Sequence, residues 1–117
     1  MEDCIFCKIA DGVIPSEKVF ENEDVIAFKD INPVTPIHIL VIPKKHIESI
    51  VRLNSEEDYE CVKSIHKAIN EIAVKLNIAD EGFRVVVNCG ENGGQEVKHL
   101  HYHILAGKKL GTKIVEE

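Results

Sequence analysis

The chain has 117 residues, of which 44% are hydrophobic and 29% are charged, a balance typical of globular domains. This length suffices for one hydrophobic core without disulfides, so we expect residues 1–117 to form a single domain. Fourteen Lys and Arg against twenty Asp and Glu give a formal net charge of −6. This charge argues against binding to a nucleic-acid polymer, because such binding needs a basic surface.

The composition excludes some cellular contexts but leaves small ligands open. The first eight residues lack a basic segment followed by an apolar run, so we expect no signal peptide. No stretch approaches about 18 consecutive apolar residues, so we expect no membrane span. Four cysteines without a secretory signal predict a reducing compartment, the cytoplasm, where free thiols or metal binding are expected instead of disulfides.

Turn residues and periodicity divide the chain into short strands and one long helix. Val62, Ile65, Ile69, Ile72 and Leu76 recur at spacings of three and four, which predicts one apolar helix face against a sheet. Because short turns join neighbouring strands, the expected fold class is α+β with a mostly antiparallel sheet. The expected elements are a short helix over 4–11, strands over 18–21, 25–29 and 37–42, a helix beginning at Ser55, and strands over 83–89 and 98–106.

Three histidines alternate with bulky apolar residues in His99-Leu100-His101-Tyr102-His103. In a strand these imidazoles share one face, and imidazole titrates near neutral pH, which suits a nucleophile, a proton donor or a metal ligand. His99 and His103 would lie about 13 Å apart along a strand, so at most two of the three share a metal ion. Alternatively, the middle imidazole attacks phosphorus while a neighbour donates a proton, or all three are hydrogen-bonded structural residues.

The residues just before the histidines suit an anion. Asn88 offers a side-chain amide, and Gly93, Gly94 and Gln95 offer flexible backbone whose N–H groups can converge on a phosphate. A simple hairpin turn is the alternative interpretation of these glycines.

Two further polar residues lie in or beside apolar strands. His38 shares a strand face with Leu40 and Ile42, where a lone histidine is normally a core residue. If its strand pairs near the histidine strand, its imidazole could orient a catalytic one. Asp30, at a strand end, could hydrogen-bond ribose hydroxyls, as acids do in nucleotide sites, or cap its own turn.

Cys4 and Cys7 form a Cys-x-x-Cys pair near the amino terminus. Such a pair supplies half of a tetrahedral zinc site, which thiolate or imidazole ligands would complete. A redox role is less favoured, because the pair does not follow a strand of a βαβ unit. Two free thiols are the remaining alternative.

Residues 93–105, Gly-Gly-Gln-Glu-Val-Lys-His-Leu-His-Tyr-His-Ile-Leu, resemble the signature of the histidine triad (HIT) superfamily, in which three histidines alternate with hydrophobic residues. Residues 27–33 and 38–47 resemble the upstream blocks of the same superfamily, so the resemblance extends from about residue 4 to residue 111. The sequences on either side of the triad look most like the Hint branch, the nucleoside phosphoramidate hydrolases. The resemblance implies a HIT-like fold and a homodimer.

The resemblance also implies roles for individual residues. His101 would attack the α-phosphate and form a nucleotidyl-histidine that water cleaves, while His103 contacts the phosphate and His38 orients the catalytic imidazole. Asp30 would hold the ribose of a purine nucleotide of the AMP or GMP type. The implied base contacts are Ile14, Phe28 and Ile31, and the implied phosphate contacts are Asn88, Gly94, Gln95, Glu96 and Val97.

Members with a similar amino terminus bind zinc, which here implies Cys4, Cys7, His46 and His99 as ligands of a structural ion. Other members lack these cysteines, so the chemistry does not need the metal. The chain departs from part of the superfamily at Glu96, where some members have a Ser or Thr whose hydroxyl assists the leaving group. A carboxylate at this position disfavours an anionic leaving group nearby.

The resulting hypothesis is a hydrolase that cleaves a P–N or mixed-anhydride bond at the α-phosphate of nucleoside 5′-phosphoramidates or acyl-nucleotides. A dinucleoside polyphosphate hydrolase is one alternative. A non-catalytic nucleotide-binding or interaction module is the other, although the presence of His101 argues against it.

Overall fold

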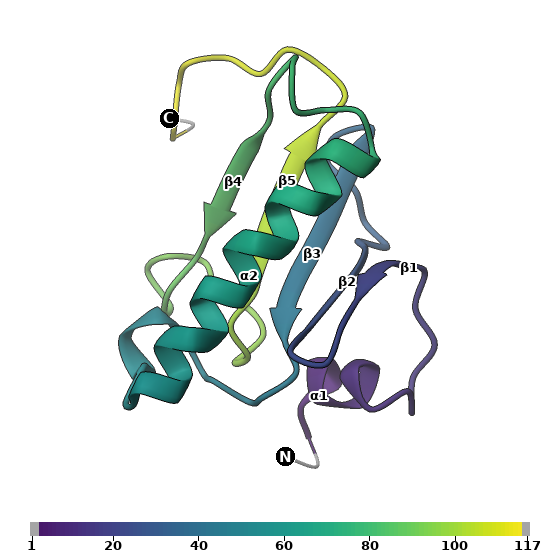
Figure 1. The fold of residues 1–117 in the computed structure, drawn as a ribbon. Coiled ribbons are helices and arrows are strands. Elements are labelled where there is room, and N and C mark those ends of the chain that lie inside the picture. The colour runs from purple at the N-terminus through teal and green to yellow at the C-terminus, as the bar shows by residue number, and fades with distance from the viewer. Residues whose placement is uncertain (1–2, 116–117) are drawn as a thin grey trace.

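A five-stranded sheet covered on one face by a long helix organises the protein (Figure 1). The computed structural model describes residues 3–115. The strand order is β1-β2-β3-β5-β4, and every neighbouring pair is antiparallel, which confirms the predicted α+β class. The elements are α1 (Ile5–Ala10), β1 (Lys18–Glu21), β2 (Val25–Lys29), β3 (Ile37–Pro43), a 3-10 turn (Ile50–Arg52), α2 (Glu56–Lys75), β4 (Arg84–Val87) and β5 (Tyr102–Ala106).

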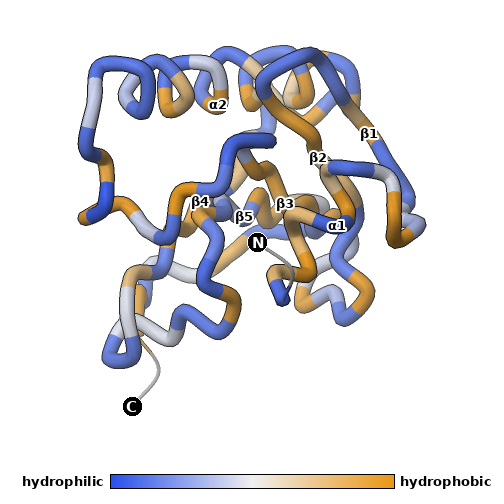
Figure 2. Tube along the Cα trace, turned by 90° about the horizontal axis from the view of Figure 1, so that it is seen from below, coloured by the Kyte–Doolittle hydropathy of each residue, from blue (hydrophilic) through white to orange (hydrophobic). Residues whose placement is uncertain are grey.

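Both faces of the sheet are buried, because alternate side chains of the central strand β3 point to opposite sides. Ile39 and Val41 pack with the apolar face of α2, whereas Leu40 and Ile42 pack with Phe6 of α1. Figure 2 shows the strands lying between α2 and α1. The short amino-terminal helix therefore closes the face of the sheet that α2 leaves free.

Helix α2 begins where the sequence predicts. The Ser55 hydroxyl accepts a hydrogen bond from the Asp58 N–H, a typical N-cap. The Asp58 carboxylate also pairs with Lys45 at 2.7 Å, and this contact fixes the segment that carries His46. No helix within residues 3–115 has the length and apolar character needed to cross a membrane.

The last two strands are shorter than predicted. β5 begins at Tyr102 and β4 covers only Arg84–Val87, so the prediction of strands over 98–106 and 83–89 was wrong at these ends. The Leu100 N–H donates to the Ile47 carbonyl at 2.6 Å, and the His99 N–H donates to the Val97 carbonyl. These bonds lead the backbone away from β4, so only the third histidine of the triad lies in a strand.

Removing the side chain of Ile72 should destabilise the fold, because this residue of α2 is fully buried in the core beneath the sheet. We expect Ile72→Ala to lower the free energy of unfolding by about 2–5 kcal/mol, since the cavity left behind adds to the lost burial. Urea unfolding measures this, with Val74→Ala as the matched control because Val74 lies on the same helix but is 72% exposed. Equal effects of the two changes would contradict this packing.

Candidate active site

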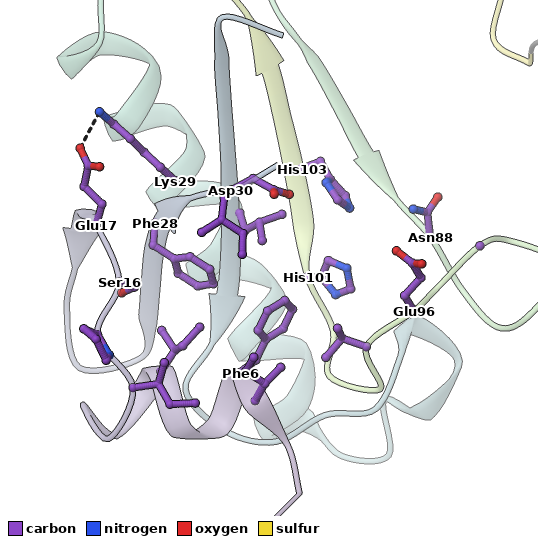
Figure 3. Close-up of a pocket in the computed structure, with 18 residues that line it drawn as sticks. Phe6, Ser16, Glu17, Phe28, Lys29, Asp30, Asn88, Glu96, His101 and His103 are labelled. Atoms are coloured by element: carbon purple, nitrogen blue, oxygen red, sulfur yellow. Dashed lines mark ion pairs between the residues drawn. The ribbon is translucent and has the colours of Figure 1, made fainter. Parts of the chain in front are cut away.

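A cavity of about 640 Å³ lies between α1 and the start of β5 (Figure 3). Its wall is apolar on the side of Phe6 and Phe28, and it carries polar groups on the side of His101, His103 and Asn88. A largely apolar cavity with a few converging polar groups is the usual form of a small-molecule site. The polar end is therefore where chemistry is expected.

His101 presents one free ring nitrogen to this cavity. Its Nδ1–H donates to the backbone carbonyl of His99 at 2.8 Å, so Nε2 of the neutral ring keeps its lone pair. The ring is only 8% exposed, and Phe6 packs against it edge-on with the ring centroids 5.0 Å apart. An oriented imidazole with an unprotonated nitrogen facing a cavity can act as a nucleophile.

His38 holds His103 in the other neutral tautomer, with the ring proton on Nε2. The Val34 N–H donates to His38 Nδ1 at 3.2 Å, so the proton of the neutral His38 ring is on Nε2. This nitrogen lies 2.9 Å from His103 Nδ1 and donates to it, which leaves the His103 proton on Nε2. His103 therefore offers a hydrogen-bond donor beside the lone pair of His101.

The structure changes two expectations about the histidines. His99, His101 and His103 do not share one strand face: His101 and His103 line the cavity, whereas the His99 ring lies among the cysteines near the amino terminus. His38 contacts His103 and not His101. The group that orients His101 is the His99 carbonyl, which the side-chain pattern could not reveal.

Most of the residues predicted to bind a nucleotide line the cavity. Asp30 is among them; one oxygen accepts the Asn32 N–H at 2.8 Å, and the other lies 3.4 Å from His38 Nε2. Gln95 does not line it: its amide donates to the carbonyls of Glu48 and Val97 and so holds the loop together. The other predicted residues in the wall are Ile14, Phe28, Ile31, Asn88, Gly94, Glu96 and Val97.

The sequence analysis missed part of the wall. Phe6 and Ile9 of α1 belong to it, as do Glu17 and Lys29, which form an ion pair of 2.7 Å at its rim. The spacing of three between Phe6 and Ile9 indicates a buried helix face. That spacing does not say whether the face meets the core or a cavity.

A second cluster of side chains lies at the start of α1. Ligand atoms of Cys4, Cys7, His46 and His99 all lie within 4.8 Å of one another, close enough to hold a metal ion. His99 Nδ1 is 3.3 Å from Cys4 Sγ and 3.5 Å from Cys7 Sγ, and His46 Nδ1 is 3.3 Å from Cys7 Sγ. Zinc bound tetrahedrally to sulfur and nitrogen holds these atoms about 3.6 Å apart.

The chemistry of the donors also fits a metal. His99 Nε2–H donates to the Pro43 carbonyl at 2.8 Å, so Nδ1 of the neutral ring directs its lone pair towards the two sulfurs. Burial lowers the pKa of His99 to about 4 and keeps this ring neutral. Burial and the hydrogen bond with Cys4 raise the pKa of Cys7 to about 11, and a metal that binds the sulfur would displace the thiol proton.

A third group, Asp30, His38 and His103, also lies within 4.8 Å, but its hydrogen bonds fit a metal less well. The Val34 N–H occupies His38 Nδ1, and His38 Nε2 carries the proton that it donates to His103. A metal on Nε2 would require the ring proton on Nδ1, opposite the Val34 N–H. The group serves better as a hydrogen-bond chain.

His103 should stay neutral well below the pH at which an ordinary histidine is protonated. Burial, followed by the neighbouring His101 and His38, lowers the pKa of His103 to about 4. Because an unfolded histidine titrates near 6.5, the unfolded chain binds protons first, and His103 makes stability fall as the pH drops from about 6.5 towards 4. Two-dimensional NMR of the ring nitrogens measures this, and titration of His103 near pH 6.5 would contradict it.

Comparison with known proteins places the chain in a family. Residues 3–114 match the family model described as "Scavenger mRNA decapping enzyme C-term binding". A histidine triad protein from Clostridium difficile is 57% identical, with 97% of each chain covered and a TM-score of 0.93. A HIT family hydrolase from Clostridium thermocellum is 48% identical over 98% of this chain and 99% of that chain, with a TM-score of 0.93. A histidine triad nucleotide-binding protein from Candida albicans is 31% identical over 98% of this chain and 85% of that chain, with a TM-score of 0.84. This chain, with its matching triad and fold, therefore belongs to the histidine triad superfamily.

Proposed function

We propose that the protein is a nucleotide-binding hydrolase that cleaves a P–N or mixed-anhydride bond at the α-phosphate of nucleoside 5′-phosphoramidates or acyl-nucleotides. The observation that carries the proposal is the pair of ring nitrogens at the polar end of the cavity. The hydrogen bonds of the two Nδ1 atoms leave a lone pair on Nε2 of neutral His101 and a proton on Nε2 of neutral His103. The two rings have centroids 5.1 Å apart, so both can reach one phosphate group.

The proposed reaction has two displacements at phosphorus. His101 Nε2 attacks the α-phosphorus, the P–N bond breaks, and the leaving nitrogen takes a proton from solvent and departs as the amine. Water then attacks the phosphorus of the nucleotidyl-histidine and gives one proton to solvent; the bond from phosphorus to Nε2 breaks, which releases the nucleoside monophosphate and restores the lone pair of His101. His103 donates to a phosphate oxygen through Nε2–H, and charge on that oxygen strengthens the bond as it develops.

The nucleotide is proposed to extend from the apolar side of the cavity to its polar end. The apolar side, which includes Phe6, Ile14 and Phe28, suits a purine base of AMP or GMP type, and Asp30 suits the ribose hydroxyls. Asn88 and the backbone at Gly94 border the phosphate end. The names of the related proteins from Clostridium thermocellum and Candida albicans, a hydrolase and a nucleotide-binding protein, support this assignment.

Glu96 favours an amine over a phosphate as the leaving group. Glu96 is an exposed residue that lines the same cavity as His101, and Figure 3 shows it on the side of the cavity that carries Asn88 and His101. A carboxylate at this position repels an anionic leaving group. A dinucleoside polyphosphate would have to place its second phosphate chain near this charge. The same charge disfavours acyl-nucleotides, because their carboxylate leaves as an anion. We therefore prefer phosphoramidates as substrates to both acyl-nucleotides and dinucleoside polyphosphates.

We also propose that the protein works as one domain, in the cytoplasm, as a homodimer and without a nucleic-acid polymer. Four cysteines that form no disulfide support a reducing compartment. β4 is the last strand of the sheet order and Val85 is 39% exposed, so this edge offers a surface to a second copy. Sedimentation analysis measures the oligomeric state.

Replacing the proposed nucleophile should abolish turnover. We expect His101→Ala to lower the rate of adenosine 5′-phosphoramidate hydrolysis by several powers of ten, because the covalent route is lost and each tenfold is about 1.4 kcal/mol of barrier. His66→Ala is the matched control, since His66 is an exposed histidine of α2. Near-native activity of His101→Ala would overturn the mechanism, and faster hydrolysis of a dinucleoside polyphosphate by the wild type would overturn the substrate class.

We propose zinc as the metal of the cluster formed by Cys4, Cys7, His46 and His99. With four protein ligands zinc has no open position, so when bound it stabilises the fold and does not activate water. We expect chelation to lower the melting temperature and to leave turnover at saturating substrate largely intact below that temperature. Changing both cysteines to alanine should have the same effect. Purified protein without zinc, or turnover that chelation abolishes and zinc alone restores, would contradict this role.

A further inference from the structure

Helix α1 belongs to two sites at once. Cys4 and Cys7 contribute to the metal cluster, whereas Phe6 and Ile9 lie in the wall of the cavity. Phe6 is 7% exposed and contacts three aromatic rings edge-on: His101 at 5.0 Å, Phe28 at 5.7 Å and His99 at 6.0 Å between centroids. A shift of this helix away from the cluster therefore also moves the ring that packs against the nucleophile.

His99 makes a second connection between the same two sites. Its Nδ1 faces both cysteine sulfurs, and its backbone carbonyl, in the same residue, accepts the hydrogen bond that orients His101. The side chain is completely buried, and its Nε2–H donates a hydrogen bond to the Pro43 carbonyl. A movement of the ring would therefore also displace the backbone carbonyl that orients His101.

The amino-terminal helix depends on its packing and on the cysteines of the cluster. It is six residues long, and helices of this length are not stable on their own. Its N-cap interaction is the bond from the Cys7 N–H to Cys4 Sγ at 3.3 Å, so one of the metal ligands also caps the helix. Apart from the cluster, α1 is attached to the sheet mainly through the buried Phe6 and Ile9.

We propose that occupancy of the Cys4–Cys7–His46–His99 cluster controls nucleotide affinity, with Phe6 as the positioning residue that connects the two sites. This inference rests on the proposed nucleotide site. A metal ion orders α1 and the backbone at His99, so a nucleotide binding to the metal-loaded protein no longer bears the cost of ordering them. The metal then tightens nucleotide binding, and the nucleotide must tighten metal binding by the same factor.

The test measures both sides of this linkage. AMP affinity is determined by calorimetry for metal-free and zinc-loaded protein, and zinc affinity by competition with a chromogenic chelator, with and without saturating AMP. We expect both ratios to be equal and at least about fivefold, within the range of roughly 5- to 150-fold common for coupled sites. Binding of AMP with the same affinity to both forms overturns the inference but leaves the proposed function intact, whereas no binding of AMP to either form overturns both.

Three variants identify the route of the coupling. Phe6→Leu should keep zinc affinity measured without AMP but bring the linkage ratio close to one, because leucine cannot reproduce the edge contact with His101. Phe83→Leu makes the same change at a partly buried residue outside both sites and should leave the ratio unchanged. Asp30→Ala should weaken AMP binding equally in the metal-free and the zinc-loaded protein. The polar contacts of Asp30 are with Asn32 and His38, which lie outside α1.

Two outcomes would reject Phe6 as the connecting residue. One is a Phe6→Leu protein that retains the wild-type ratio, and the other is a Phe83→Leu protein that loses it. Cys4→Ser with Cys7→Ser controls for zinc bound by AMP itself, because zinc should no longer change AMP affinity in this protein. A zinc effect that persists there would also overturn the inference.

Discussion

The arrangement of the whole site depends on the buried residue His99. Its Nε2–H bonds to the Pro43 carbonyl at the end of β3, its Nδ1 faces Cys4 and Cys7, and its own carbonyl accepts from His101 Nδ1–H. The residue is fully buried, so none of these bonds competes with water. One residue therefore sets the tautomer of the proposed nucleophile and the orientation of a metal ligand.

A chain of hydrogen bonds gives the two histidines of the cavity different tasks. It starts at the Val34 N–H, passes through His38 and ends at His103, whose outer nitrogen then carries a proton. His101 is bound to a carbonyl instead, so its outer nitrogen carries none. Backbone groups in two different loops thus decide which imidazole accepts and which donates, although the residues are chemically identical.

Periodicity predicted α2, whereas runs of apolar residues between turn residues predicted β2 and β3, which are buried on both faces. Periodicity failed at His99 and His101, which lie outside the strand, since the bond from Leu100 to the Ile47 carbonyl is made with a segment more than fifty residues away. Resemblance to the superfamily supplied the grouping of Cys4 with His99, which local pattern cannot give. The part played by Phe6 needed the three-dimensional contact between α1 and the cavity.

The central claim is that His101 Nε2 forms a covalent bond to the α-phosphorus. Protein quenched with acid-free denaturant during turnover of adenosine 5′-phosphoramidate can be digested and mapped by mass spectrometry. The account predicts an adenylyl group on the peptide containing His101, located on that residue by fragmentation, and none in His101→Ala. An adenylyl group on His103 or His38, or steady turnover without any labelled protein, would contradict it.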